Sequence, residues 1–322
     1  MINKDEARNQ LSNGAVELFD DIVNSRILGA SKQTNLICKI LASIVQDETN
    51  DIQVAKQKVE IVANYFKETR GQNSRAIYNA ISELLISISP KLAHKEFLDR
   101  RAIVDMINSY ETTLITNVKK SAEYAAALCK QMDTIMIFDY SSTVDMFVEK
   151  LAEKKRIYIP ESRALDGGKP FLKTAVRGHH DVHFIPDTTM FVQLRKAQAA
   201  FIGAETIYPD GSVFNTVGTD ILAILCKECN IPLYAISPMI KIDVRNVYGY
   251  TKLAPMEFDY SIRLAKDWND KEKEGIDFSG IKLVKIESKY LSAIITEKGI
   301  IPSHAFYQEA ISYNERLEEK IC

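Results

Sequence analysis

The stretch FIGAETIYPDGSVFNTVGTD, residues 201–220, decides the fold class of this chain. It begins inside an apolar run, residues 199–203, of the kind that forms a buried parallel strand. Glu205 comes just after that run, at the end of the strand where an open α/β sheet binds its ligands. A turn at residues 209–211 follows, and an apolar helix is predicted at residues 221–229. The stretch therefore predicts one strand–turn–helix unit of an α/β sheet.

The residues that lead into this helix are small and polar: Asn215, Gly218 and Thr219. The first N–H groups of a helix have no partner within the helix, and the helix dipole favours negative charge there. These residues therefore mark a candidate anion site. An ordinary connection between a strand and a helix is the alternative interpretation.

Short apolar runs alternate with helical patterns from Thr134 onward, which is typical of a parallel sheet. The predicted strands are 134–138, 156–160, 182–185, 199–203 and 231–236, and the predicted helices between them are 144–154, 169–177 and 221–229. Residues 241–280 are polar and irregular, so we expect an excursion over the surface. We expect an edge strand at 281–286, a turn at Gly299 and a helix after Pro302.

The first ~130 residues are predicted to be helical, because apolar residues recur at three- and four-residue spacing. Pro90 is the only proline before residue 131, and the helix from about Ser74 should end before it. A longer helical pattern extends from about residue 95 to 129. The prediction is thus an α/β protein with an N-terminal helical domain, residues 1–130, and a Rossmann-like parallel-sheet domain, residues 131–322.

The composition is that of a soluble globular protein, with 46% hydrophobic and 26% charged residues. A formal net charge of −2 provides no broad basic field, so we expect no direct binding of nucleic acid. The sequence has neither a signal-peptide pattern nor an apolar run of membrane-spanning length. The five cysteines are scattered, which is typical of a reducing compartment. We therefore expect a cytoplasmic protein without membrane contact.

The central stretch resembles the signature of a known family. This family unites the α, β and δ subunits of translation initiation factor 2B with two isomerases, which act on methylthioribose 1-phosphate and ribose 1,5-bisphosphate. The signature is roughly G-A-[DE]-x-I-x-x-[ND]-G-x-V-x-N-K-x-G-T. The matching residues are Gly203, Ala204, Glu205, Ile207, Asp210, Gly211, Val213, Asn215, Gly218 and Thr219.

Further markers of the resemblance are spread along the chain. Glu161-Ser162-Arg163 with Gly168-Lys169 is similar to the family's E-[ST]-R-P and G-K, and Glu68-Thr69-Arg70 is similar to its E-T-R-P-T. Gly29-Ala30 resembles an R-G-A turn, although Leu28 stands at the arginine position. The resemblance implies that Gly29, Arg70, Arg163, Gly168 and Lys169 bind a phosphorylated ligand, and an arginine fork suits phosphate oxygens.

Three positions depart from the isomerases. Asp139, in Phe138-Asp139-Tyr140-Ser141, stands where they have a catalytic cysteine, whereas Tyr140 and Ser141 resemble regulatory subunits. Glu205 stands at the catalytic aspartate, as in the α subunit, and Thr216 stands at the lysine of N-K-x-G-T. A thiol donor thus becomes a carboxylate at neutral pH. Two carboxylates without that lysine would repel a phosphate unless one of them were protonated.

No metal site or cofactor is expected. His179, His180 and His183 form HHxxH, but this spacing near a strand does not place all three on one face, so we interpret them as solvated loop residues. Cys226 and Cys229 lie within an apolar helix, where packing is a better interpretation than redox chemistry.

Two functions follow from these residues. One is a protein that binds a phosphorylated sugar or nucleotide without turnover, as the resemblance to the α subunit implies. Its ligand-binding residues would be Gly29, Arg70, Ser141, Arg163, Gly168, Lys169, Asn215, Thr216, Gly218 and Thr219. The other is an aldose–ketose isomerase of a ribose 1-phosphate derivative, with Asp139 as general base and Glu205 as general acid. The resemblance also implies a homodimer, and a regulatory role would imply a protein partner.

Overall fold

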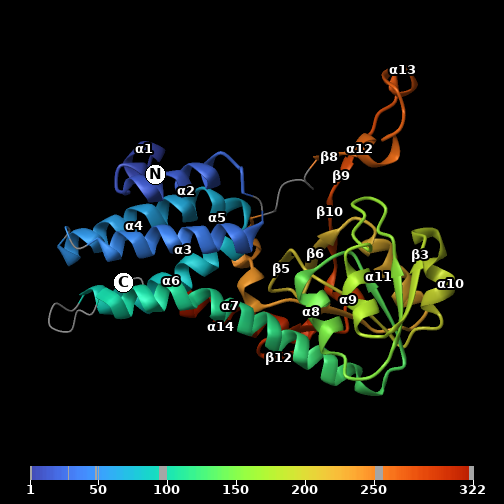
Figure 1. Cartoon of the computed structure of the whole chain (residues 1–322). Helices are drawn as coiled ribbons and strands as arrows, with labels where there is room; N and C mark the ends of the chain where they lie inside the picture. The colour runs from blue at the N-terminus through green and yellow to red at the C-terminus, as the bar shows by residue number, and fades with distance from the viewer. Residues whose placement is uncertain are drawn as a thin grey trace. The chain divides into compact units, whose positions relative to one another are not determined.

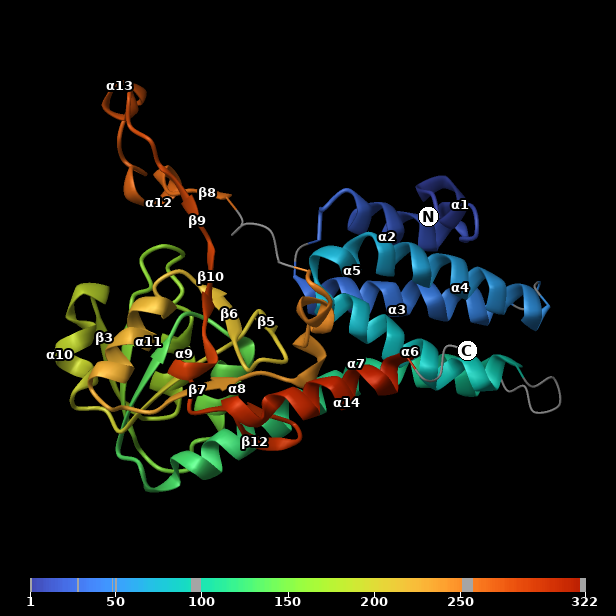
Figure 2. The same ribbon diagram turned by 180° about the vertical axis from the view of Figure 1, so that it is seen from behind.

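The computed structural model describes residues 2–27, 29–47, 49, 51–93, 100–250 and 257–318. The chain divides into two compact units, Met1–Thr116 with Ser312–Cys322, and Asn117–Ile311. Figures 1 and 2 show the first unit as helical and the second as a sheet with helices. This is the α/β class that the sequence predicts. The expected domain boundary after residue 130 stays a prediction. Within the described ranges, each helix is too short or too polar to cross a membrane.

Amphipathic helices build the first unit. They are α1 (Lys4–Arg8), α2 (Asn13–Val23), α3 (Ala30–Gln46), α4 (Ile52–Glu68), α5 (Arg70–Asn73), α6 (Arg75–Ala93) and the start of α7 (Arg100–Leu128), with the end of α14 (Phe306–Glu318). In both views α2, α3 and α4 lie side by side. Their apolar faces are buried, as at Phe19, Ile40 and Phe66, and their burial stabilises the unit.

One expectation for this unit is wrong. The helix from about Ser74 does not end before Pro90, because α6 runs on to Ala93. Pro90 lacks an amide donor, so α6 loses one backbone hydrogen bond there, and only three helical residues follow it. Residues 95–99 of the long predicted helix and Leu28 lie outside the described residues.

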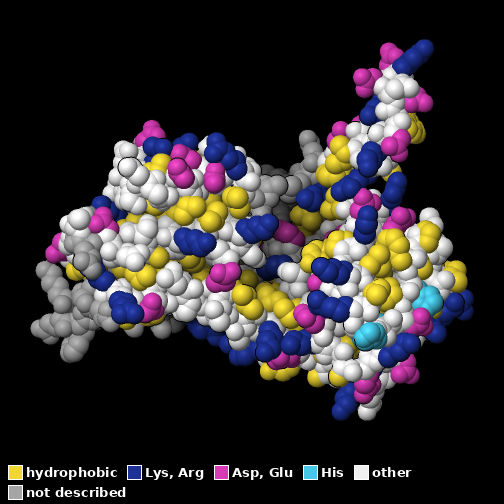
Figure 3. Space-filling view, viewed as in Figure 1, with side chains coloured by type: hydrophobic (Ala, Val, Ile, Leu, Met, Phe, Trp, Pro, Cys, Tyr) yellow, Lys and Arg dark blue, Asp and Glu magenta, His cyan; other side chains and the backbone are white. Residues whose placement is uncertain are grey.

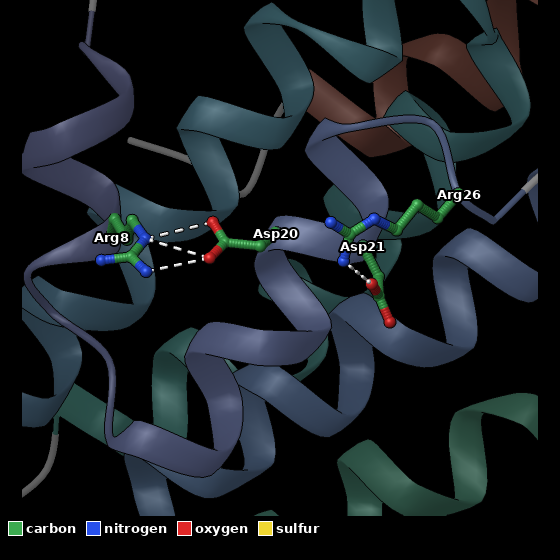
Figure 4. Close-up of polar contacts among 4 residues, drawn as sticks. All are labelled: Arg8, Asp20, Asp21 and Arg26. Carbon is green, nitrogen blue, oxygen red and sulfur yellow. Dashed lines mark hydrogen bonds and ion pairs between the residues drawn. The ribbon is translucent and has the colours of Figure 1, made fainter.

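Figure 4 shows two ion pairs of the first unit, one between α1 and α2 and one between α2 and the residues that follow it. Arg8 donates to both carboxylate oxygens of Asp20, with Nη2 2.9 Å from Oδ2. Arg26 donates to Asp21 over 3.0 Å. Water screens exposed pairs of this kind, so their contribution to stability is small.

The second unit contains a seven-stranded sheet in the order β12-β11-β7-β4-β1-β2-β3. Its strands are β1 (Thr134–Phe138), β2 (Arg156–Pro160), β3 (Asp181–Ile185), β4 (Ala199–Ile202), β7 (Leu233–Ile236), β11 (Ala293–Thr296) and β12 (Gly299–Pro302). All neighbours pair in parallel except β11 and β12. Each of the five predicted parallel strands is present, within two residues at either end.

Side chains alternate between the two faces of this sheet. On one face Ile135 and Ile137 of β1 pack with the end of α7, α8 (Ser142–Lys150) and α9 (Phe171–Arg177). Met136 and Phe138 of β1 therefore point to the opposite face. On that face α10 (Met190–Leu194) contacts β2 and α11 (Thr219–Glu228). Both faces of the sheet are covered, which explains why its strands read as unbroken apolar runs.

A second, three-stranded sheet was not predicted, and two of its strands directly follow β4 in the chain. It has the order β10-β6-β5, from β5 (Thr206–Ile207), β6 (Val213–Thr216) and β10 (Leu283–Ile286). The expected edge strand at 281–286 therefore pairs antiparallel with β6 and not with the main sheet. Asn215 and Thr216 consequently lie in a strand, whereas Gly218 and Thr219 lie at the start of α11.

The polar segment after β7 is more ordered than the sequence predicts. A short turn of 3-10 helix, Met239–Lys241, follows β7, and a second one covers Val244–Tyr248. Further on, β8 (Glu257–Asp259) pairs with β9 (Ser279–Ile281), and α12 (Ser261–Leu264) and α13 (Asp270–Lys273) lie between them. Ile242, Asp243 and Val244 are buried, so the first part of the predicted excursion, residues 241–280, does not lie on the surface.

Charged side chains of both signs are mixed over the described surface of each unit, on the face that Figure 3 shows. The sequence carries 41 basic and 43 acidic side chains, a near balance that agrees with this distribution.

Candidate functional site

A pocket of about 410 Å³ lies in the second unit, beside the carboxyl ends of β1 and β4. This is the edge at which open α/β sheets bind ligands. Its walls come from the segments that follow β1, β4 and β7, and from the small sheet. The lining residues are Asp139, Tyr140, Ser141, Ser142, Ala204, Glu205, Asn215, Thr216, Lys241, Lys282 and Leu283. Five of the residues predicted for the site, Asp139, Ser141, Glu205, Asn215 and Thr216, thus line one pocket.

Asp139 is held by hydroxyl groups on both sides. It directly follows β1 with φ of 54°, a left-handed conformation that few non-glycine residues adopt. Ser162 Oγ donates to Oδ1 over 2.9 Å, and Thr216 Oγ1 donates to Oδ2 over 2.6 Å. Two hydroxyl donors therefore fix the orientation of this buried carboxyl group.

Burial raises the pKa of Asp139, because the surroundings disfavour the charged carboxylate more than its hydrogen bonds favour it. The hydroxyl groups of Thr216 and Ser162, the Tyr140 amide and the charge of Lys282 all act in the opposite direction. Gly167 allows this arrangement, since a Cβ there would lie 1.9 Å from Oδ1 of Asp139. The chain thus keeps a carboxyl group in a poorly solvated position, where protonation is easier than it is in water.

Glu205 and Lys241 form the second charged part of the pocket. Glu205 follows β4, and its carboxylate accepts a hydrogen bond from Thr206 Oγ1. Lys241 Nζ donates to the carbonyl oxygen of Ala204 over 2.6 Å. Burial lowers the pKa of Lys241, whereas the charge of Glu205 raises it. The carboxylate and the ammonium therefore balance each other at the pocket wall.

Asn215 supplies an unpaired donor. Its side chain is buried and lines the pocket, and within the described ranges its Nδ2 has no hydrogen-bond acceptor. Buried amide donors are nearly always paired, because leaving one unpaired costs about 1–3 kcal/mol. A ligand oxygen in the pocket would pair it.

The helix start predicted as an anion site lies just beyond the pocket lining. Gly218 adopts φ of 95°, which favours glycine, and its amide donates to Asp220 Oδ1 over 2.9 Å. Thr219 begins α11 and is fully buried, and its Oγ1 has no partner among the described residues. Asp220, in the first turn of α11, thus already accepts a hydrogen bond from one of the backbone amides at the start of the helix.

The segment after β2 contains Ser162, which donates to Asp139, and further contacts hold this segment in place. Asp187 accepts hydrogen bonds from the amides of Ser162 and Arg163, over 2.9 and 2.8 Å. The side chain of Arg163 is exposed, with Nη1 4.0 Å from Asp166. Gly168 is buried against β2, where a Cβ would lie 2.1 Å from the Pro160 carbonyl oxygen. Lys169, Arg163 and Gly168 do not line the pocket, so their predicted contacts with phosphate remain predictions.

Gly29 and Arg70 belong to the first unit. Gly29 has φ of 94° and precedes α3. Arg70 Nη2 donates to the carbonyl oxygens of Ile22 and Val23, over 2.5 and 2.6 Å. A guanidinium at the C-terminal end of α2 interacts favourably with the helix dipole, so Arg70 has a structural role there. Its predicted contact with phosphate remains a prediction.

The structure places His180, His183 and Cys226 in packed or strand positions. His180 is buried and its Nδ1 accepts from the Lys155 amide over 3.2 Å, and His183 lies in β3, so these two are not solvated loop residues. Burial raises the pKa of Cys226 to about 12, which disfavours the reactive thiolate. Within the described part of the chain, no group of three His, Cys, Asp or Glu side chains could hold a metal ion.

Sequence reasoning missed the two lysines of the pocket. Lys241 lies five residues after the end of β7, and Lys282 lies between β9 and β10. Lys241 belongs to the predicted surface excursion, residues 241–280, and Lys282 belongs to the predicted edge strand, residues 281–286. The position of Lys241 after a buried strand was the available signal, because segments that leave parallel strands at their carboxyl ends approach the ligand site.

Comparisons with known proteins agree with this fold. Residues 27–303 match the model of the Initiation factor 2 subunit family. The chain is 29% identical to the methylthioribose-1-phosphate isomerase of Bacillus pumilus, over 92% of this chain and 86% of that protein. It is 22% identical to the ribose 1,5-bisphosphate isomerase of Archaeoglobus fulgidus, over 95% and 96% of the two chains.

A solved structure supports the fold independently. The translation initiation factor eIF-2B of Pyrococcus horikoshii matches with a TM-score of 0.65 at 20% identity, over 91% of this chain and 98% of the other. The family match, the long alignments and the shared fold lead to one conclusion: this chain belongs to the Initiation factor 2 subunit family.

Proposed function

We propose that this protein binds a phosphorylated sugar or nucleotide in the pocket beside β1 and β4, and that it does so without turnover. The observation that carries the proposal is the buried amide of Asn215, which lines the pocket and whose Nδ2 has no acceptor among the residues that the structure describes. Lys241 and Lys282 add positive charge to the same walls. Such a set of donors favours an anionic ligand rich in oxygen atoms.

The geometry of Asp139 supports binding over catalysis. A general base for proton transfer between C1 and C2 of a sugar needs a carboxylate oxygen directed at the substrate. Both oxygens of Asp139 already accept from hydroxyl groups, and burial raises its pKa, which disfavours the basic form at a given pH. The carboxyl group therefore serves the internal structure of the pocket.

Isomerisation of a ribose 1-phosphate derivative is the second candidate, and the two relatives named as isomerases favour it. Asp139 would act as general base and Glu205 as general acid. Hydrogen bonds in an empty site can rearrange when substrate binds, so this mechanism has a definite test.

Binding is tested by calorimetric titration with sugar phosphates and nucleoside monophosphates. We expect one of these compounds to bind, and Asn215→Ala to weaken its binding. Arg163→Ala should also weaken binding, whereas Arg195→Ala, which removes another exposed arginine, should not. If no phosphorylated compound binds the wild-type protein, the proposed function is wrong. If Asn215→Ala folds and binds as the wild type does, the ligand lies elsewhere.

Turnover is tested by proton NMR in deuterated water with methylthioribose 1-phosphate and ribose 1,5-bisphosphate. We expect neither deuterium incorporation nor ketose formation. Turnover that disappears in Asp139→Asn, where a general base would contribute roughly 10²–10⁴-fold, would replace the binding function with the isomerase.

We also propose a homodimer formed through the second unit. The strand β12 lies at the edge of the main sheet, and Ile300 within it is 42% exposed. An edge strand offers unpaired backbone groups to a second chain. Light scattering after size exclusion should give twice the protomer mass of 36.4 kDa, and a monomer at micromolar concentration would contradict the proposal.

A further inference from the structure

We propose that the second unit holds a further binding site, for a small carboxylate with an apolar body. The site is a pocket of about 210 Å³ at the amino ends of β1 and β2, which we call the amino-end pocket. Lys130, shortly before β1, and Lys155, directly before β2, both line it. The pocket beside β1 and β4 lies at the carboxyl ends of the strands and has different lining residues. The inference is therefore independent of the proposed function.

Small apolar side chains leave space for a ligand in the amino-end pocket. Ala126 and Ala127 lie in the last turn of α7, and Leu151 and Ala152 directly follow α8. Ala126 and Leu151 pack against the apolar core on the same face of the main sheet as α8 and α9. The three alanines extend only to Cβ, so they leave a hollow with an apolar wall. Hydrocarbon in contact with this wall would be removed from water, which favours binding.

The charged side chains of the amino-end pocket are mostly positive. Lys130, Lys150 and Lys155 bring three ammonium groups, and Glu153 brings one carboxylate. An alternative interpretation is that the lysines only offset the helix dipoles where α7 and α8 end. Each helix end carries roughly −0.5 charge, so the two ends together do not cancel the surplus of positive charge. The amino-end pocket therefore favours an anion.

Lys155 supplies a buried donor in this pocket. Its side chain is only 2% exposed, and Nζ donates to the Lys130 carbonyl oxygen over 2.9 Å and to Glu153 Oε2 over 3.2 Å. An ammonium group has three N–H donors, so beyond these two acceptors in the described part of the chain one donor remains. The Glu153 side chain is 59% exposed, and water weakens its compensation of the buried charge. A carboxylate ligand would accept the remaining N–H and compensate the cation.

The size of the pocket and its two kinds of wall define the class of ligand. Pockets for drug-sized ligands have about 300–1,000 Å³, so the amino-end pocket suits a smaller molecule. Inorganic phosphate would pair with the lysines but leave the apolar wall in water. A neutral hydrocarbon would cover the wall but leave the Lys155 donor without an acceptor. A short aliphatic or aromatic monocarboxylate meets both requirements.

The test measures binding of 4-methylpentanoate and of its neutral amide, 4-methylpentanamide, to the full chain by saturation-transfer NMR. We expect the carboxylate to bind with a dissociation constant on the order of 1 mM, and the amide to bind at least about tenfold more weakly. Lys155→Met keeps the length of the side chain without its charge, so it should weaken carboxylate binding by about 10- to 100-fold. Lys154→Met is the matched control, because Lys154 is exposed and does not line the pocket.

A second variant keeps the test decisive if Lys155→Met disturbs folding. Ala127→Phe fills the amino-end pocket from an exposed position on α7 and should weaken carboxylate binding by at least about tenfold. Glu123→Phe adds the same side chain one turn earlier, outside the lining, and should leave binding unchanged. Equal binding of the acid and the amide, or unchanged carboxylate binding in a folded Lys155→Met or Ala127→Phe variant, would overturn the site. No detectable carboxylate binding at about 10 mM, or its full displacement by an equal concentration of inorganic phosphate, would overturn the ligand class.

Discussion

Replacing Thr216 with valine should reveal how the pocket holds Asp139. Valine has nearly the shape of threonine but lacks the hydroxyl group, so Asp139 loses its donor at 2.6 Å and keeps Ser162 at 2.9 Å. A hydrogen bond to a charged group contributes about 1.5–3 kcal/mol, and one between neutral groups about 0.5–1.5 kcal/mol. We therefore expect a loss of about 2 kcal/mol in the free energy of unfolding when Asp139 is ionised, and about 1 kcal/mol when it is protonated.

Urea denaturation of Thr216→Val at pH 4.5 and pH 8, followed by circular dichroism, measures this difference. The loss should be larger at pH 8, because the valine raises the pKa of Asp139 further by removing a donor to the charged form. A difference of 1.4 kcal/mol corresponds to about one pKa unit. Thr189→Val is the control, since Thr189 donates to the Pro186 carbonyl near the surface. A loss below about 0.5 kcal/mol at both pH values would refute the argument.

Two further predictions concern Asp139, which follows β1, and Gly168, which follows β2. Burial raises the pKa of Asp139 above the unfolded value, so its ionisation costs the folded protein stability as the pH rises from about 4 through the folded pKa. Asp139→Asn should avoid that loss, and its stability relative to the wild type in urea should therefore increase between pH 4 and pH 7; a constant difference would contradict the shift. Gly168→Ala should lower the free energy of unfolding by about 1–3 kcal/mol, because its Cβ would lie 2.1 Å from the Pro160 carbonyl oxygen. Gly14→Ala, where a Cβ meets open space inside α2, should instead stabilise the chain by about 0.5–1 kcal/mol, and equal effects of the two alanines would contradict the packing argument.

The strands of the main sheet could be predicted because their environment leaves a strong signal. β1 and β2 have the predicted bounds, Thr134–Phe138 and Arg156–Pro160, because a strand that is covered on both faces needs an unbroken apolar run. The strand β6 carries no such run. Its sequence, VFNT, has two apolar and two polar residues and pairs within a small separate sheet. Local pattern alone cannot separate such a strand from a loop.

The contacts within the pocket depend on the order of the strands in the sheet. Asp139 and Thr216 are 77 residues apart, and they meet because β4 pairs with β1 and the chain then turns back through β6. The resemblance marked both positions but could not show that the two side chains bond to each other. The sequence gives no such indication for Lys241, because its segment is polar and predicts a surface excursion.

The positions at which this chain departs from the isomerase signature are therefore not independent. Asp139 and Thr216 replace a thiol and a cation, and they now form one hydrogen-bonded pair. A lysine at residue 216 would bring a charge to Asp139, whereas threonine brings a neutral donor, and the pKa of the buried carboxyl group stays above its usual value. Glu205 in turn has a cation nearby in Lys241. Restoring Asp139→Cys alone would leave the Thr216 hydroxyl group without its carboxylate acceptor, so activity engineered into this pocket should require the paired exchange of residues 139 and 216. These contacts support the proposed binding site with its own charge balance over an isomerase site that has lost single residues.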